Sequence, residues 1–201
     1  MTFLYLKGSN LSDNQFLGID IAVLVPLCIF QSWTGAWPQL THNVPQESLF
    51  SVPVLTSVLG MAAIQGAFTF YVQDSFVTEA RLGPSYIKCV PAATLVADDP
   101  PCSANTVLYL FTSIQYITTC LVFSVAKPFR KHIWTNPAFL FSVIIISAYQ
   151  VFLILSPDTY SADLFALVPL PQHYRYELFA LVCANCLCSY FWELILRTWL
   201  Y

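Results

Sequence analysis

Five long apolar segments, separated by shorter polar stretches, dominate the sequence. Each is close to the roughly 20 predominantly apolar residues that a helix needs to cross the hydrocarbon core of a bilayer. In lipid the backbone must satisfy its own hydrogen bonds, and the period-two alternation of a barrel is absent. We therefore predict an all-α membrane protein with about five transmembrane helices, at residues 15–32, 49–72, 104–126, 137–156 and 178–200.

The composition supports the bilayer as the solvent of this chain. Apolar residues make up 57% and charged residues 9% of the sequence, against roughly 25% charged residues in soluble domains. The mean hydropathy is +0.65. With a net charge of −3 and no basic tract, the sequence gives no support for binding nucleic acid.

The charges in the connecting loops predict the orientation. Residues 127–136 carry three Lys or Arg within five positions, which places this loop in the cytosol by the positive-inside rule. Alternation then places residues 33–48 and the C-terminus on the cytosolic side as well. The longer loops at 73–103 and 157–177 are expected on the opposite side.

Seven cysteines divide between one loop and the apolar segments. Cys89 and Cys102 share the long non-cytosolic loop, where an oxidising compartment would permit a disulfide; the sequence leaves open whether they pair. The CxxC pair of Cys183 and Cys186 could serve redox chemistry or a metal, but buried cysteine more often behaves as a small hydrophobe.

Two acids at the first apolar segment are the strongest candidates for function. Asp13 and Asp20 are seven residues apart, which in a regular α-helix places both on one face about 10.5 Å apart. An ionisable residue inside a membrane helix is costly and tends to mark a substrate or ion path. The alternatives are that Asp20 pairs with a neighbouring helix or reaches the interface, and that Asp13 sits in water. Pro26 is expected to interrupt the same helix.

Other polar residues within the apolar segments are weaker candidates. Gln115 and Asn185 could line a path, although such residues more often form hydrogen bonds between helices. Glu193 and Arg197 are expected to form a local ion pair. The three His lie in loops, and motifs for nucleotide binding, phosphorylation or a catalytic nucleophile are absent. We expect no catalytic residue, metal or cofactor in this chain.

Three stretches carry a family resemblance. They are NLSDNQFLGID at 10–20, SLFSVPVL at 48–55 and SIQYITTCLVFSVAKPFRKHIWTN at 113–136. They resemble the P-type ATPases of the fifth type, subgroup B, which include polyamine exporters of late endosomes and lysosomes. The resemblance covers essentially the whole chain. It implies that residues 1–201 are the C-terminal transmembrane domain of such a pump, in an endosomal, lysosomal or vacuolar membrane.

The resemblance also assigns helices and site residues. Residues 1–7 would be the end of the fifth helix of the family, and the five apolar segments its sixth to tenth. Asp13 and Asp20 would be acids of the cationic substrate's path, with Phe16 the aromatic residue between them. Carboxylates with an aromatic ring suit a polyamine or another cation, through charge pairing and cation–π contact.

The parts of a pump that use ATP are absent from the sequence. The full-length parent would bind ATP and magnesium, whereas this chain is expected neither to hydrolyse ATP nor to pump. It could be a fragment, a truncated gene model or a short isoform, and its partners would be the lipid bilayer and the missing part of the pump or an intact pump chain. An independent five-span protein that acts as an interaction or regulatory subunit is the alternative.

Overall fold

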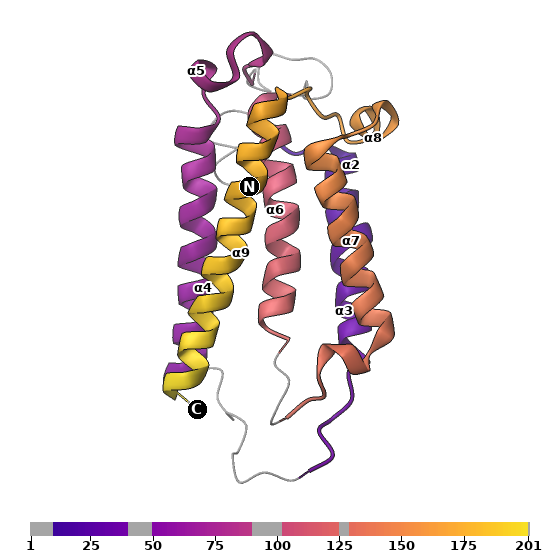
Figure 1. Cartoon of the computed structure of the whole chain (residues 1–201), viewed down its shortest axis with the longest axis vertical. Helices are drawn as coiled ribbons and strands as arrows, with labels where there is room; N and C mark the ends of the chain where they lie inside the picture. The colour runs from indigo at the N-terminus through magenta and orange to yellow at the C-terminus, as the bar shows by residue number, and fades with distance from the viewer. Residues whose placement is uncertain (1–9, 40–49, 90–101, 125–128, 201) are drawn as a thin grey trace.

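The chain is a bundle of long helices that run side by side along the longest dimension of the molecule (Figure 1). A computed structural model describes residues 10–39, 50–89, 102–124 and 129–200. The helices within these ranges are α2 (Asp13–Leu17), η1 (Gly18–Leu24), α3 (Val25–Ser32), α4 (Val52–Tyr71), η2 (Val72–Phe76), α5 (Glu79–Leu82), η3 (Gly83–Ser85), α6 (Ser103–Val122), η5 (Ile133–Thr135), α7 (Pro137–Leu155), α8 (Thr159–Leu164) and α9 (Gln172–Leu200).

The predicted all-α membrane fold is confirmed. Four continuous helices are long and apolar enough to cross a membrane: Asp13–Ser32, Val52–Phe76, Pro137–Leu155 and Gln172–Arg197. The protein is therefore an integral multi-pass membrane protein. The helix end expected at residues 1–7 and the first residue of the second predicted segment, Leu49, lie outside the described residues.

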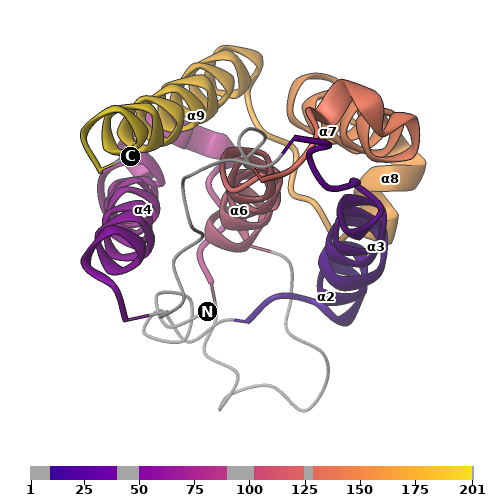
Figure 2. The same cartoon turned by 90° about the horizontal axis from the view of Figure 1, so that it is seen from below.

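The third predicted span, 104–126, is the central helix of the bundle, α6. α6 has 20 residues, of which 14 are buried, and Figure 2 shows it enclosed by α4 and α9 on one side and α3 and α7 on the other. It is not among the helices that qualify as spans by their own apolar composition. The reason is its position, since neighbouring helices shield it from lipid and it can carry polar residues. The four apolar spans, together with α6, occupy the five segments that the sequence predicts.

The first spanning helix is continuous but contains a π-helical stretch, η1. Its buried side is a row at strict four-residue spacing, formed by Gln15, Ile19, Val23 and Leu27. In an α-helix of 3.6 residues per turn such a row drifts around the axis. The wider π turns, with their i→i+5 hydrogen bonds, counter that drift and keep the row against the bundle.

Pro26 follows the π-helical stretch and is accommodated without a break. The Val25 N–H donates to the Asp20 carbonyl, five residues back. A proline cannot donate to the carbonyl four residues before it, and its ring clashes with that carbonyl in a regular helix. The widened turn relieves this conflict. The sequence predicted an interruption of the helix at Pro26. The structure shows a continuous helix that changes from α to π type before this residue.

The loops gather at the two ends of the bundle. At one end the first loop pairs with the loop before α7, because Trp37 N donates to the Phe129 carbonyl at 3.0 Å and Lys131 N to the Gly35 carbonyl at 3.0 Å. At the other end the Tyr174 hydroxyl donates to the Phe76 carbonyl at 3.2 Å. The grouping of the loops by side therefore agrees with the alternation predicted from their charges. Lys127, one of the three cations in that argument, lies outside the described residues.

Candidate functional site

The two predicted acids lie on one continuous helix and point away from the packed interior. Asp13 is in the first turn of α2, where a negative charge interacts favourably with the helix dipole. Asp20 belongs to η1. Both residues are exposed. Neither carboxylate forms a hydrogen bond or an ion pair with a residue that the structure describes. Both acids are therefore open to a ligand or to another part of a larger protein.

Phe16 has a different environment from the acids. It is half-buried and packs against the main hydrophobic core. The place of Phe16 between the acids came from the family resemblance, whereas the separation of about 10.5 Å assumed a regular α-helix. The helix type changes at Gly18, so that the turn before Asp20 is wider than this geometry requires. The structure therefore places the carboxylates on the open side of the helix and the aromatic ring toward the core.

The helix that carries the acids is fixed by polar contacts with the last residue of α8 and the residue after it. Gln15 is fully buried and donates from Nε2 to the Phe165 carbonyl at 2.8 Å. Asn14 donates from Nδ2 to the Leu164 carbonyl at 2.9 Å. The Ser12 hydroxyl and the Gln15 side chain also form a capping box at the start of the helix. These contacts hold the position of Asp13 relative to the bundle.

Gly18 lets the Phe165 ring approach this helix closely. A Cβ atom on Gly18 would lie 2.7 Å from Phe165 Cε1 and 3.2 Å from the Tyr109 hydroxyl. The rings of Tyr109 and Phe165 stack with centroids 5.4 Å apart. The sequence analysis did not single out Gly18, although a glycine inside an apolar helix is a signal of close packing. The acids thus depend on a contact with a residue far away in the sequence.

Gln115 belongs to a chain of hydrogen bonds that joins three helices. Its Oε1 accepts from the Thr69 hydroxyl at 3.1 Å, and its Nε2 donates to the Gln65 carbonyl at 3.1 Å. Gln65 in turn donates from Nε2 to the Ser189 hydroxyl at 3.0 Å. This chain of contacts links α4, α6 and α9. Of the two roles that the sequence allowed for Gln115, path lining and hydrogen bonding between helices, these contacts correspond to hydrogen bonding between helices.

Asn185 lies deep in the bundle on α9. It is 1% exposed, and its Nδ2 donor has no hydrogen-bond partner within the described part of the chain. The adjacent Cys186 forms a contact of 3.0 Å between its Sγ and the Thr118 hydroxyl oxygen. No group of three or more His, Cys, Asp or Glu that could hold a metal occurs among the described residues.

Cys89 and Cys102 form a disulfide in the structure, with Cα atoms 5.0 Å apart. The bridge lies just before α6, and α6 begins at the end of the bundle opposite to the paired loops (Figure 1). Ile87 and Ser103 next to it are joined by a hydrogen bond from Ser103 N to the Ile87 carbonyl at 3.0 Å. The disulfide therefore ties the loop after α4 to the start of the central helix.

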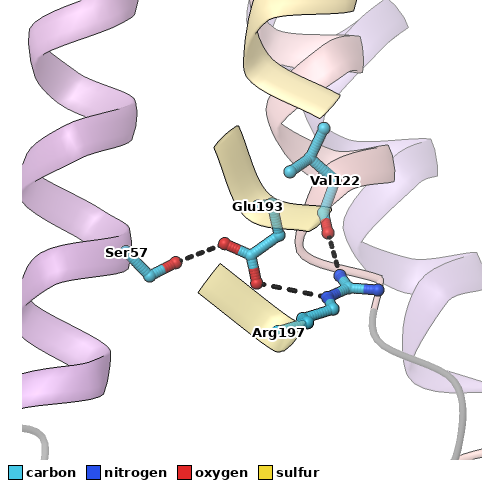
Figure 3. Close-up of polar contacts among 4 residues, drawn as sticks. All are labelled: Ser57, Val122, Glu193 and Arg197. Carbon is cyan, nitrogen blue, oxygen red and sulfur yellow. Dashed lines mark hydrogen bonds and ion pairs between the residues drawn. The ribbon is translucent and has the colours of Figure 1, made fainter. Parts of the chain in front are cut away.

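Glu193 and Arg197 form the ion pair expected from their spacing, with Arg197 Nε 3.3 Å from Glu193 Oε1. Two further contacts extend it to three helices (Figure 3). The Ser57 hydroxyl on α4 donates to Glu193 Oε2 at 2.6 Å. Arg197 Nη2 donates to the Val122 carbonyl at the end of α6, at 2.7 Å. The pair therefore joins α4, α6 and α9, a role that sequence spacing alone did not indicate.

The protein is similar to cation and polyamine pumps. No protein-family model matches the chain. It is 28% identical to the vacuolar cation-transporting ATPase YPK9 of Saccharomyces cerevisiae over 92% of its length. It is 29% identical to the polyamine-transporting ATPase 13A3 of Mus musculus over 94% of its length, and 33% identical to the polyamine-transporting ATPase 13A2 of Homo sapiens over 77%.

The match covers most of this chain but only a short part of each relative. The chain spans 12%, 17% and 13% of these three relatives, respectively. Further cation-transporting ATPases, from Caenorhabditis elegans and Homo sapiens, match at 27% and 28% identity over 94% and 76% of the chain. Because the human polyamine-transporting ATPase 13A2 is 33% identical over 77% of the chain, the chain belongs to the P-type ATPases of the fifth type, subgroup B, and matches a short part of them.

Proposed function

We propose that this chain supplies part of the substrate path and the supporting helices of a pump that moves a polyamine or another cation. Asp13 and Asp20 hold the positive groups of the substrate, and the bundle around α6 keeps their helix in place. The observation that carries the proposal is the pair of exposed carboxylates on one membrane-spanning helix, with no partner among the described residues. Such residues in a membrane helix commonly mark ion or substrate paths.

The chemistry of the acids suits an elongated cation. A carboxylate accepts charge-assisted hydrogen bonds from ammonium groups, and these are roughly twice as strong as neutral ones. Two carboxylates along one helix can hold two ammonium groups of one polyamine. Phe16 can add a cation–π contact only if its ring leaves the core, so we assign it a packing role first. The printed names of the relatives, which include polyamine and cation transport, support this substrate class.

The energy for transport comes from other parts of the pump. The motifs that would bind ATP or accept its phosphate are absent from this sequence, so we propose that this chain does not hydrolyse ATP by itself. ATP and magnesium belong to the complete pump, and the partner of this chain is the remainder of such a pump. An endosomal, lysosomal or vacuolar membrane follows from the resemblance and from the name of the yeast relative.

The proposal is tested by substrate binding to the chain itself. The 201-residue chain is placed in lipid nanodiscs, and spermine binding is measured by the shift that spermine causes in the unfolding midpoint. Asp20→Asn should weaken binding about tenfold or more, because a hydrogen bond to a charged group contributes about 1.5 to 3 kcal/mol. Asp13→Asn should weaken it as well, and the double variant most.

The matched control is Asp163→Asn, which removes an exposed acid from α8. It should leave the spermine-induced shift unchanged. A second arm replaces the matching segment of the yeast vacuolar cation-transporting ATPase with this chain and measures spermine-stimulated ATP hydrolysis. If Asp20→Asn has no more effect than Asp163→Asn in either arm, the assignment of Asp20 to the substrate path is wrong.

A further inference from the structure

Two buried polar atoms near the middle of the bundle have no hydrogen-bond partner in the described part of the chain. They are the Nδ2 donor of Asn185 on α9 and the Oε1 acceptor of Gln65 on α4. Asn185 lies about halfway along the span Gln172–Arg197, and Gln65 about halfway along Val52–Phe76. An unpartnered polar group is costly at this depth, because the hydrocarbon core of a bilayer offers no water to it. A ligand that pairs with both atoms would remove that cost.

The contacts of Gln65 place its side-chain amide close to Asn185. Gln65 Nε2 donates to the Ser189 hydroxyl at 3.0 Å. Asn185 and Ser189 are both buried on α9, and their separation of one helical turn corresponds to a rise of about 6 Å. Gln65 Oε1 belongs to the same amide that reaches Ser189. A water that hydrogen-bonds to two groups, each at about 2.8 Å, spans about 5 Å between them, so this spacing is suited to one bridging water.

Gln115 on α6 supplies a third polar group at the same place. Its Nε2 donates to the Gln65 backbone carbonyl at 3.1 Å, and its Oε1 accepts from the Thr69 hydroxyl at 3.1 Å. An amide oxygen has two lone pairs, so Gln115 Oε1 can accept a second hydrogen bond. Buried waters typically make about three hydrogen bonds to polar groups that would otherwise lack partners. Asn185 as a donor, with Gln65 and Gln115 as acceptors, satisfies that number.

The chemistry of these three groups favours water over an ion. All three are neutral amides, one offering an N–H and two offering an oxygen. A metal cation would be repelled by the N–H of Asn185, and an anion would be repelled by the two amide oxygens. Glu193, the carboxylate further along α9, is already paired with Arg197. Water both donates and accepts, and it therefore matches the whole set.

We propose that one water molecule binds where α4, α6 and α9 meet. It accepts from Asn185 Nδ2 and donates to Gln65 Oε1 and Gln115 Oε1. Each of the three helices thus contributes one side chain to a single hydrogen-bonded centre within the membrane. Asn185 then has a partner inside the bundle, and its polarity needs no contact with a transported substrate. This inference does not depend on the transport function.

Met61 can report on water at this place. It is 3% exposed, and its Sδ accepts from Gln65 Nε2 at 3.6 Å. The 201-residue chain is placed in lipid nanodiscs and given a brief X-ray pulse, which converts water into hydroxyl radicals. Mass spectrometry then measures the oxidation of each methionine. A water bound to Gln65 should cause oxidation of Met61 although this side chain is buried.

The matched control is a methionine in an apolar part of the bundle. Leu27 is 1% exposed and belongs to a hydrophobic cluster with Ile117 and Phe139, and Leu27→Met conserves the volume of the side chain. Both methionines are then compared in one molecule. We expect Met61 to be oxidised roughly fivefold faster or more, because only Met61 lies beside a polar group that can hold water. Equal rates would show that the junction is dry and would overturn the proposal.

Two variants test whether Asn185 holds the water. Asn185→Leu removes the donor and should lower the oxidation of Met61 roughly threefold or more. Thr118→Val removes the hydroxyl that contacts Cys186, the neighbour of Asn185, and should leave the oxidation of Met61 unchanged. The unfolding midpoint shows that both variants are folded. If Asn185→Leu left the oxidation unchanged, Asn185 would not bind the water; if it raised the oxidation, bulk water would be entering a loosened bundle. Either result would contradict the proposal.

Discussion

The role of a glycine in this bundle depends on how closely a side chain of a neighbouring segment approaches it. Gly18 faces the ring of Phe165, and Gly60 faces the ring of Trp192, at distances that leave no space for a Cβ atom. Gly66, on the same helix as Gly60, has nothing within 4 Å of the place where its Cβ would be. The three glycines are alike in the sequence, but only two of them have a packing role.

Replacement of these glycines by alanine separates the two situations. Gly18→Ala and Gly60→Ala should each destabilise the protein by about 1 to 3 kcal/mol, the usual cost of overpacking. Gly66→Ala should leave the stability unchanged or raise it by about 0.5 to 1 kcal/mol, because alanine is preferred within helices. Unfolding in mixed detergent, followed by circular dichroism, measures the three differences. A loss for Gly66→Ala as large as for Gly18→Ala would contradict the packing argument.

Among the helices, α9 connects the others. It packs against α4, α6 and α7, and its polar contacts with α4 come from Ser189 and Glu193. Hydrogen bonds between membrane helices contribute modestly, about 0.6 kcal/mol on average. The Glu193 ion pair is a stronger case, because Glu193 is nearly buried and a carboxylate without its cation is costly there.

Removal of one partner should therefore cost more than removal of both. Arg197→Met leaves the Glu193 carboxylate with the Ser57 hydroxyl alone, and should destabilise the bundle by about 2 to 4 kcal/mol, scaled down from fully buried pairs. The double variant Glu193→Gln/Arg197→Met should recover at least half of that loss. A double-mutant cycle of unfolding free energies measures the coupling. A purely additive cycle would show that the pair has no special role between the helices.

At the scale of the whole molecule, the two ends of the bundle differ in chemistry. One end carries the paired loops with Arg130 and Lys131, and the other carries the Cys89–Cys102 disulfide. Disulfides persist in oxidising compartments, whereas positive loops remain in the cytosol. Two independent rules therefore assign the same orientation.

Chemical labelling of sealed vesicles tests this orientation. Lys131→Cys and Asp163→Cys place an exposed thiol at opposite ends of the bundle. In vesicles with the cytosolic face outward, a membrane-impermeant maleimide should label the Lys131→Cys protein and leave the Asp163→Cys protein unlabelled until detergent is added. The unsubstituted protein corrects for its own free cysteines. Labelling of both variants before detergent would contradict a fixed orientation.

Hydropathy depends on local sequence alone, and it predicted which segments form the long helices but not where each helix begins. The first predicted span, 15–32, begins two residues inside the observed helix Asp13–Ser32. The last, 178–200, begins six residues after Gln172, where α9 starts. Those six residues, two of them tyrosines, have low hydropathy and therefore do not extend the predicted span, although the helical backbone continues through them. The third predicted span, 104–126, begins one residue after the start of α6, although α6 is less apolar than the other long helices.

For the candidate site, too, some features follow from local sequence and others only from helix packing. The sequence alone determined that the chain crosses the membrane repeatedly and carries acids on its first spanning helix, because the cost of burying charge and bare backbone in lipid acts on each segment separately. Only the tertiary structure decided what holds that helix and which residue of another helix Glu193 contacts. Gln15 meets Phe165 across 150 residues and Ser57 meets Glu193 across 136. Contacts over such separations depend on how the helices pack, which no local pattern in the sequence records.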